Sequence, residues 1–177
     1  GITGVAYNAS IMPIKVLQSS GTGNSSDLAQ AINYASNKGA SVINMSLGSY
    51  GESMTVKSSL ENAYAGTGDN KGSMLVAAAG NDGQCICNDC GLCATMFPAG
   101  YPFVLGIQAD ANFSNHDPTG PIEYTHPDGF NYEMTAPGVN IISTKTNGGY
   151  WGKSGTSMAS PLVAGAVALM RHNDSTL

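Results

Sequence analysis

The feature that most constrains the fold is the apolar run at residues 73–79, Ser-Met-Leu-Val-Ala-Ala-Ala. A run of this length without polar alternation is typical of a strand that is buried on both faces of a sheet. It follows an alternation of expected elements, with strands at 11–17 and 41–47 and helices at 26–37 and 54–65. Strands that alternate with helices pair in parallel through right-handed crossovers. We therefore predict an α/β protein built on a parallel sheet.

The remaining elements are shorter. Pro13 suggests that the strand at 11–17 is irregular or lies at an edge, and Ser25 or Ser26 is expected to cap the first helix. Further strands are expected at 103–109 and near 133–135 and 140–143, and a final helix follows Ser157. The sequence contains no internal repeat and no low-complexity linker.

Sites in parallel α/β folds form at the carboxyl ends of strands. This rule selects three places in the chain: residues 46–48, residues 79–81 and the loop after Leu17. Asn81 lies in a Gly-Asn-Asp-Gly stretch, which is also a common turn sequence because Asn and Gly tolerate a positive φ. The strand ends are therefore candidate sites that need support from other residues.

Charge excludes one class of partner. Only 11% of the 177 residues are charged, the formal net charge is −5, and no run of Lys and Arg is present. Because phosphate contacts need clustered basic side chains, we expect no nucleic-acid partner. The longest apolar stretch, residues 162–170, is too short and too rich in glycine to span a bilayer, so we also expect no membrane partner. The length fits one domain or a large part of one.

Ser157 has two interpretations. It stands in Gly-Thr-Ser-Met-Ala-Ser-Pro, where a turn with a glycine meets the final apolar helix. A serine at such a junction is often a helix N-cap. The same position suits an acyl-transfer nucleophile, because the positive end of a helix favours the negative charge of the intermediate. The residues around Ser157 alone leave both interpretations open.

Four segments together resemble one family. They are residues 42–48 (Val-Ile-Asn-Met-Ser-Leu-Gly), 76–83 (Val-Ala-Ala-Ala-Gly-Asn-Asp-Gly), 136–139 (Ala-Pro-Gly-Val) and 155–161. Their order and sequence resemble those of subtilisin-like serine proteases, the subtilases, over nearly the whole chain. The resemblance implies a three-layer α/β/α fold with a parallel sheet. It also implies a serine endopeptidase that acts on polypeptides and needs no cofactor for catalysis.

The resemblance also assigns roles to residues. Ser157 matches the nucleophile, and Asn81 matches the side-chain donor of the oxyanion hole, assisted by the N–H of Ser157. Two segments match those that pair with an extended substrate, and a third matches the pocket for the residue before the scissile bond. The first two are Ser46, Leu47 and Gly48, and Gly21, Thr22 and Gly23; the third is Ala78, Ala79 and Gly80. Small residues in that pocket lead us to expect a large apolar substrate side chain.

Two parts of the serine protease machinery have no match in the chain. Such proteases need a histidine base and an aspartate that orients it, and in subtilases both precede the serine. The histidines are His116, His126 and His172, and none matches the histidine motif of the family. We therefore interpret residues 1–177 as a partial catalytic domain, incomplete at its N-terminal side. We expect the isolated chain to be nearly inactive.

The missing aspartate strand would, by the resemblance, lie between the strands at 11–17 and 41–47. Its absence leaves backbone hydrogen-bonding groups without partners, which is costly where they are buried. Two solutions remain open. A complementary chain that carries the Asp and His motifs supplies the missing segment, or the two strands close up on each other through the helix between them.

An alternative function is a non-catalytic peptide-binding or structural relative that has kept the cleft without the triad. Ser157 and Asn81 favour the protease, since a binding module has no use for both. Low charge, the acidic balance and the resemblance favour an extracellular location.

The cysteines form a separate cluster, Cys85, Cys87, Cys90 and Cys93, in the loop after Asn81. Crowded disulfides, a zinc or iron site, and free thiols are all compatible with this spacing. A metal-binding or redox module would explain this loop alone. Calcium often stabilises the subtilase family, but the sequence assigns no calcium ligands in this chain.

Overall fold

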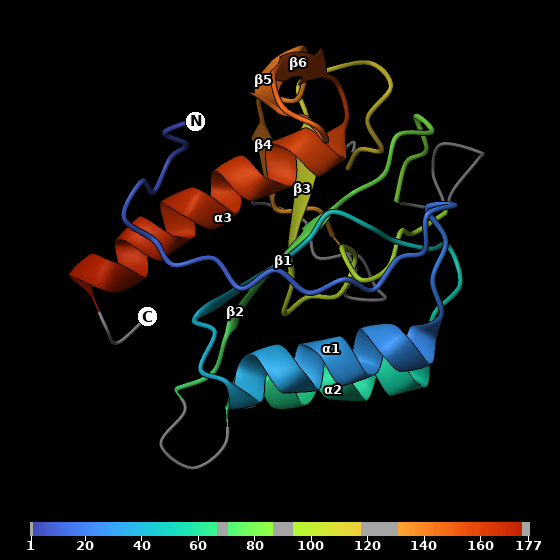
Figure 1. Cartoon of the computed structure of the whole chain (residues 1–177). Helices are drawn as coiled ribbons and strands as arrows, with labels where there is room; N and C mark the ends of the chain where they lie inside the picture. Colours follow the sequence, from blue (N-terminus) through green and yellow to red (C-terminus); the bar gives the residue numbers. More distant parts are fainter. Residues whose placement is uncertain (1, 67–70, 87–93, 118–130, 175–177) are drawn as a thin grey trace.

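The structure is a computed structural model that describes residues 2–66, 71–86, 94–117 and 131–174. The elements, in chain order, are α1 (Ser25–Asn37), β1 (Val42–Met45), α2 (Met54–Ala65), β2 (Met74–Ala78), β3 (Leu105–Ala109), β4 (Met134–Ala136), β5 (Ile141–Thr144), β6 (Tyr150–Lys153) and α3 (Thr156–Asn173). Strands β1 to β4 form one parallel sheet in the order β1-β2-β3-β4. Strands β5 and β6 form a separate antiparallel pair. Figure 1 shows α1 and α2 on one side of the main sheet and α3 on the other.

The central strand β2 is buried on both faces, as the apolar run predicts. Leu75, Ala77 and Ala79 belong to the apolar cluster that includes residues of α1 and α2. Val76 points the other way and belongs to the cluster formed with α3. Because successive side chains of a strand alternate between faces, one apolar run can serve two cores. The α/β class and the three-layer arrangement are thus confirmed.

Local capping explains where α1 and α2 begin. The N-cap of α1 is Asn24, whose Oδ1 accepts a hydrogen bond from Asp27 N at 2.8 Å, so the assignment of the cap to Ser25 or Ser26 is wrong. Asn is as good a cap as Ser, which makes neighbouring caps hard to separate by sequence.

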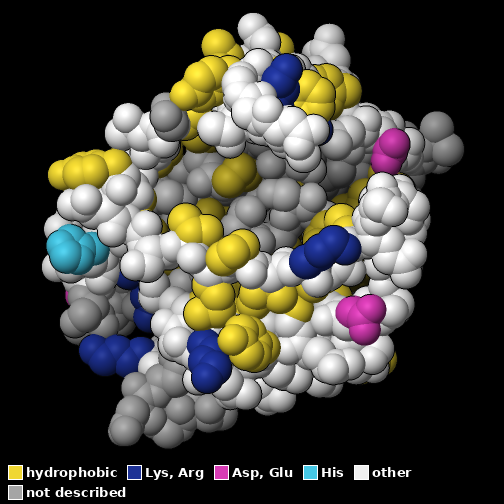
Figure 2. Space-filling model, in the orientation of Figure 1, with side chains coloured by type: hydrophobic (Ala, Val, Ile, Leu, Met, Phe, Trp, Pro, Cys, Tyr) yellow, Lys and Arg dark blue, Asp and Glu magenta, His cyan; other side chains and the backbone are white. Residues whose placement is uncertain are grey.

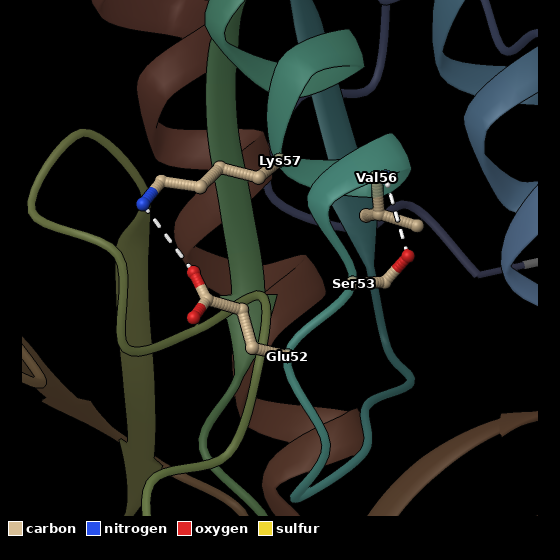
Figure 3. A network of polar contacts seen from close by, with 4 residues as sticks. All are labelled: Glu52, Ser53, Val56 and Lys57. Carbon is tan, nitrogen blue, oxygen red and sulfur yellow. Dashed lines mark hydrogen bonds and ion pairs between the residues drawn. The ribbon is translucent and has the colours of Figure 1, made fainter.

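Helix α2 begins after Ser53. Its Oγ accepts from Val56 N at 3.5 Å, and Lys57 Nζ lies 3.3 Å from Glu52 Oε1 (Figure 3). Both contacts lie where the chain enters α2, after the exposed residues 49–51.

The expected strand at 11–17 is absent from the structure. These residues form neither helix nor strand, and β1 is the edge strand of the sheet. The side chain of Ile11 is 83% exposed. The two segments therefore do not close up on each other. A strand is defined by its pairing with a neighbour, and no neighbouring strand within the described residues pairs with this segment.

Other differences are small. The shorter strands are displaced by one or two residues from the expected positions, which is ordinary for element boundaries. The β6 strand was not expected from the sequence. Among the described residues, none of the helices combines the length and the apolar character needed to cross a membrane.

Candidate active site

Ser157 lies at the start of α3 but does not cap it. It is the second residue of the helix, and Gly155 is the N-cap. The N-cap interpretation of Ser157 is therefore wrong. Gly155 has φ 151° and ψ 158°, a backbone conformation that is essentially restricted to glycine. The chain makes this turn immediately before α3 and leaves the Ser157 side chain half-buried at the positive end of the helix.

The hydroxyl of Ser157 meets the end of β1. Its Oγ donates to the backbone oxygen of Ser46 at 3.2 Å. One turn further along α3, the buried Ser160 donates through its Oγ to Asn44 Oδ1, and Asn44 Nδ2 donates to Ser46 Oγ at 3.0 Å. These bonds attach the first turn of α3 to β1. The end of β1, which the strand-end rule selects, therefore lies beside Ser157, although Ser46 and Ser157 are far apart in sequence.

Asn81 is held beside Ser157 by the buried Thr156. The Oδ1 atom of Asn81 accepts from Thr156 N at 2.8 Å and from Thr156 Oγ1 at 3.1 Å. The same Oγ1 accepts from Gly80 N at 3.1 Å. Both bonds from Thr156 end on the oxygen of the Asn81 amide. The Nδ2 group is therefore the end of this side chain that can donate to another acceptor. The N–H of Ser157 is among the first four amides of α3, which lack an acceptor within a helix.

A second polar group supports the Asn81 loop. Asn115 is 0% exposed and contacts the chain on either side of Asn81. Tyr50 joins this group, because its hydroxyl donates to Asp82 Oδ2 at 2.6 Å and accepts from Asn115 Nδ2 at 3.0 Å. Burial, followed by the hydrogen bond with Asp82, raises the pKa of Tyr50.

Thr156, Asn115 and Tyr50 were all missed in the sequence analysis. Thr156 had one available signal, since it lies inside the Gly-Thr-Ser stretch. Asn115 and Tyr50 lie in separate segments far from Asn81, so no local pattern marks them.

The predicted substrate segments differ in how closely they are tied to this site. In the first substrate segment, residues 46–48, a Cβ at Gly48 would lie 2.7 Å from Met96 Sδ and 2.9 Å from Phe97 O. This close approach requires glycine. Leu47 is half-buried. In contrast, Gly21, Thr22 and Gly23 are exposed, and they follow a turn in which Gln18 N donates to Thr22 O at 2.8 Å.

The predicted pocket residues are buried. Ala78 is 4% exposed, Ala79 is 0% exposed, and Gly80 is also buried and has φ 104°. Their position at the end of β2 agrees with the strand-end rule, and the side chain of Ala79 packs in the apolar cluster that includes residues of α1 and α2.

Only part of the cysteine and histidine set can be placed. Cys85 is buried and disulfide-bonded, so at this cysteine the disulfide alternative holds and the free-thiol alternative does not. Cys87, Cys90, Cys93 and His126 lie outside the described residues. The ring of His116 contacts Ser114 O at 3.4 Å, and the exposed His172 lies near the end of α3.

No three His, Cys, Asp or Glu side chains within the described ranges lie close enough together to hold a metal ion.

Comparison with protein families gives a match over residues 1–176 with the model of the Subtilase family. The chain is 40% identical over 176 residues to the thermophilic serine proteinase of Bacillus sp. (strain AK1), a match that covers 96% of this chain and 38% of that protein. It is 39% identical over 177 residues to subtilisin DY of Bacillus licheniformis, covering 100% of this chain and 59% of that protein. The chain thus spans about 40–60% of the length of these two relatives.

Solved structures agree with the sequence relatives. A cold-adapted subtilisin-like serine proteinase matches with a TM-score of 0.77 and 32% identity, covering 98% of this chain and 57% of that one. Sphericase matches with a TM-score of 0.76 and 30% identity, covering 92% of this chain and 54% of that one. Both matches support the α/β arrangement described above.

Proposed function

This chain belongs to the subtilase family, and we propose that it forms the serine-bearing part of a serine endopeptidase. Ser157 is the nucleophile that attacks the carbonyl carbon of a peptide bond. Asn81 Nδ2 and the N–H of Ser157 stabilise the negative oxygen that develops in the transition state. The observation that carries this proposal is the pair of hydrogen bonds from Thr156 to Asn81 Oδ1, at 2.8 and 3.1 Å. They fix which end of the amide is free to donate.

A base is needed before Ser157 can react. A hydroxyl becomes a nucleophile when a neighbouring group takes its proton, and Ser46 O, its present partner, is a carbonyl that cannot act as that base. His172 lies about 22 Å from Ser157 along α3, at 1.5 Å per residue. We therefore propose that the histidine and aspartate come from a complementary polypeptide segment, and that residues 1–177 alone hydrolyse peptides very slowly.

The open side of the sheet supports such a segment. Strand β1 has an unpaired edge within the described residues, and exposed strand edges readily accept another strand. The neighbouring N-terminal segment exposes apolar side chains that include Ile11 at 83% and Tyr7 at 72%. Figure 2 shows apolar side chains gathered across the middle of the face over which this segment runs in Figure 1. A strand placed here would pair with the backbone N–H and C=O groups at the outer edge of β1 and cover apolar surface.

The substrate is proposed to be an extended polypeptide. Residues 46–48 would pair with its backbone on one side, and residues 21–23 on the other. The pocket at residues 78–80 would take a large apolar side chain once the domain is complete.

An extracellular location is part of the same proposal. The disulfide at Cys85 supports it, because disulfides persist mainly in oxidising compartments.

The experiment mixes the purified chain with a polypeptide that carries the Asp and His motifs of a subtilase relative. Hydrolysis of a chromogenic peptide with Phe before the scissile bond is then measured. We expect the isolated chain to give little turnover, because removal of the triad leaves only about 10³–10⁴-fold catalysis over water in subtilisin. The mixture should be far more active, and Ser157→Ala should abolish that gain.

Asn81→Ala tests the oxyanion donor. Loss of the equivalent Asn in subtilisin lowers kcat by about 10²–10³-fold, and we expect the same order here. Full activity of the isolated chain would contradict the need for a complementary segment. Tight peptide binding by the mixture without turnover would instead indicate a non-catalytic relative.

A further inference from the structure

Asn115 is a fully buried asparagine whose side chain is completely engaged. Its Nδ2 donates to Ala79 O at 2.9 Å and to the Tyr50 hydroxyl at 3.0 Å. Its Oδ1 accepts from Asp82 N and from Gln84 N, both at 3.0 Å. Its own backbone N donates to Gly80 O at 2.9 Å. A carboxamide has two N–H donors and two acceptor lone pairs, so no capacity of this side chain is left unused.

The partners of Asn115 surround Asn81 without including it. Ala79 and Gly80 precede Asn81, whereas Asp82 and Gln84 follow it. From these contacts we propose that Asn115 is a positioning residue, which holds the loop so that Asn81 Nδ2 points at the developing oxyanion. This inference rests on the proposed role of Asn81. Asn115 itself touches neither substrate nor reacting atoms.

Tyr50 connects Asn115 to the loop after β1. It lies after the substrate segment at residues 46–48, and its hydroxyl joins Asn115 to Asp82. The loop after β1 and the loop after β2 are therefore fixed relative to each other through one buried amide. A displacement of about 1 Å in a catalytic group can cost about 100-fold in rate, which is the scale on which such a bridge matters.

Gly80 fits the same explanation. A Cβ on Gly80 would lie 2.4 Å from Asn115 Nδ2, well inside contact distance. Glycine at this position lets the asparagine approach the backbone closely enough to bond Ala79 O and Gly80 O. No other amino acid offers two donors and two acceptors in the same short side chain, since Asp lacks the donors and Leu lacks both.

The test is a double-mutant cycle between Asn115→Ser and Asn81→Ala in the active mixture described above. If Asn115 acts through Asn81, Asn115→Ser should lower kcat about 10–100-fold with KM changed less than about twofold. In the Asn81→Ala background the same substitution should have almost no further effect on kcat. Losses that multiply would overturn the proposal, because they would mean that Asn115 acts independently of Asn81.

A spectroscopic arm needs no turnover. In the 177-residue chain, the ¹⁵N–¹H resonances of the Asn81 side-chain amide should shift in Asn115→Ser and, more weakly, in Tyr50→Phe. Tyr50 is 41% exposed, so its loss of one hydroxyl should leave the fold intact if Asn115→Ser fails to fold. Asn24→Asp, which keeps an N-cap far in sequence from Asn81, is the control and should shift nothing there.

The two arms separate the two proposals. Unchanged Asn81 resonances in both variants would overturn the positioning role, whatever the activity. If the resonances shift but Asn81→Ala leaves the kcat of the mixture unchanged, the oxyanion role of Asn81 is refuted. Asn115 would then still be the residue that positions Asn81.

Discussion

Two regions of the molecule differ in how completely their polar and apolar groups have partners. The packed side comprises β2, β3, β4 and the loop after β2, and the open side comprises the outer edge of β1 and residues 11–17. At the carboxyl end of β2, Ala79 and Asn115 are both 0% exposed, and each polar atom of the Asn115 side chain has a partner. At the other side, Ile11 is 83% exposed and β1 has no neighbour beyond its outer edge within the described part of the chain.

This difference corresponds to the two halves of the proposed chemistry. The proposed oxyanion donor lies on the side where packing and hydrogen bonds are complete. The proposed entry of the base lies on the open side. A site can therefore be organised in one half and depend on another segment for its second half. Hydrogen-bond donors stabilise a transition state well only where the surrounding structure holds them in place. Of the two regions, only the one around Asn81 meets this condition.

Removal of a core side chain from the packed side should give the largest effect. Leu75 is 1% exposed in the cluster between the sheet and the helices α1 and α2. Leu75→Ala should lower the free energy of unfolding by about 2–5 kcal/mol through lost burial and a residual cavity. Urea unfolding followed by circular dichroism measures this.

The matched control is Leu169→Ala on α3, where the leucine is 42% exposed. A surface substitution of this kind should stay within about 0.5 kcal/mol. Equal losses for the two leucines would break the comparison, because they would mean that β2 is not packed as described.

A change at Gly80 tests the polar part of the packed side. Gly80 has φ 104°, and a Cβ would lie 2.8 Å from Met96 Cε in addition to its collision with Asn115. Gly80→Ala should therefore destabilise the chain by about 2–4 kcal/mol, from backbone strain together with overpacking.

Gly51→Ala is its control, measured by the same urea unfolding. A Cβ there would meet only Ser49 Oγ at 3.7 Å, and Gly51 has no positive φ. We expect a change within about 0.5 kcal/mol. A similar loss at both glycines would remove the special role of the approach between Gly80 and Asn115.

The sequence predicts the packed side well because its signals are local. The helices expected at 26–37 and 54–65 correspond to α1 and α2, and the uninterrupted run at 73–79 identifies β2. The strand-end rule then places Ser46 and Asn81 in the same region without further information. These elements depend on residues close to one another in the chain.

The open side and Asn115 could not be predicted in the same way. The segment at 11–17 has the composition of a strand, but pairing depends on a neighbour that no local pattern reveals. Asn115 reads as a polar loop residue, and its importance comes from partners at Ala79, Asp82 and Tyr50, all distant in sequence. Ser157 was placed correctly at the helix start, but the choice between cap and second residue needed the backbone of Gly155.

The packed side should also respond to pH through Glu133, which precedes β4. Burial raises the pKa of Glu133 from about 4.5 to about 7, although the hydrogen bond from Gly106 N opposes the rise. Between these pH values the folded chain holds a proton that the unfolded chain has lost. The free energy of unfolding should therefore fall by about 1–3 kcal/mol as pH rises from about 4.5 to 7, and change little from this group above that range.

Glu133→Gln should remove this part of the pH dependence, as measured by urea unfolding at several pH values. Glu61→Gln, at an exposed position on α2, should leave it unchanged. Retention of the full slope in Glu133→Gln would assign the pH dependence to another group.

The smallest effect in the isolated chain is expected on the open side, at Ile11. Because its side chain is 83% exposed, Ile11→Ser should change the free energy of unfolding by less than about 0.5 kcal/mol. Ile142→Ser on β5, where the side chain is 59% exposed, should have an equally small effect in the isolated chain.

The two variants should differ in their binding of the segment that carries the Asp and His motifs. If that segment covers residues 11–17, Ile11→Ser should weaken its binding by about 10-fold or more, because burial of such a side chain stabilises by about 1.5–3 kcal/mol. Ile142→Ser should leave the binding titration unchanged, since β5 pairs with β6 in a separate sheet that does not include β1. Equal affinities for the wild type and Ile11→Ser would mean that the exposed apolar segment has another use, and would separate the open edge of β1 from the surface beside it.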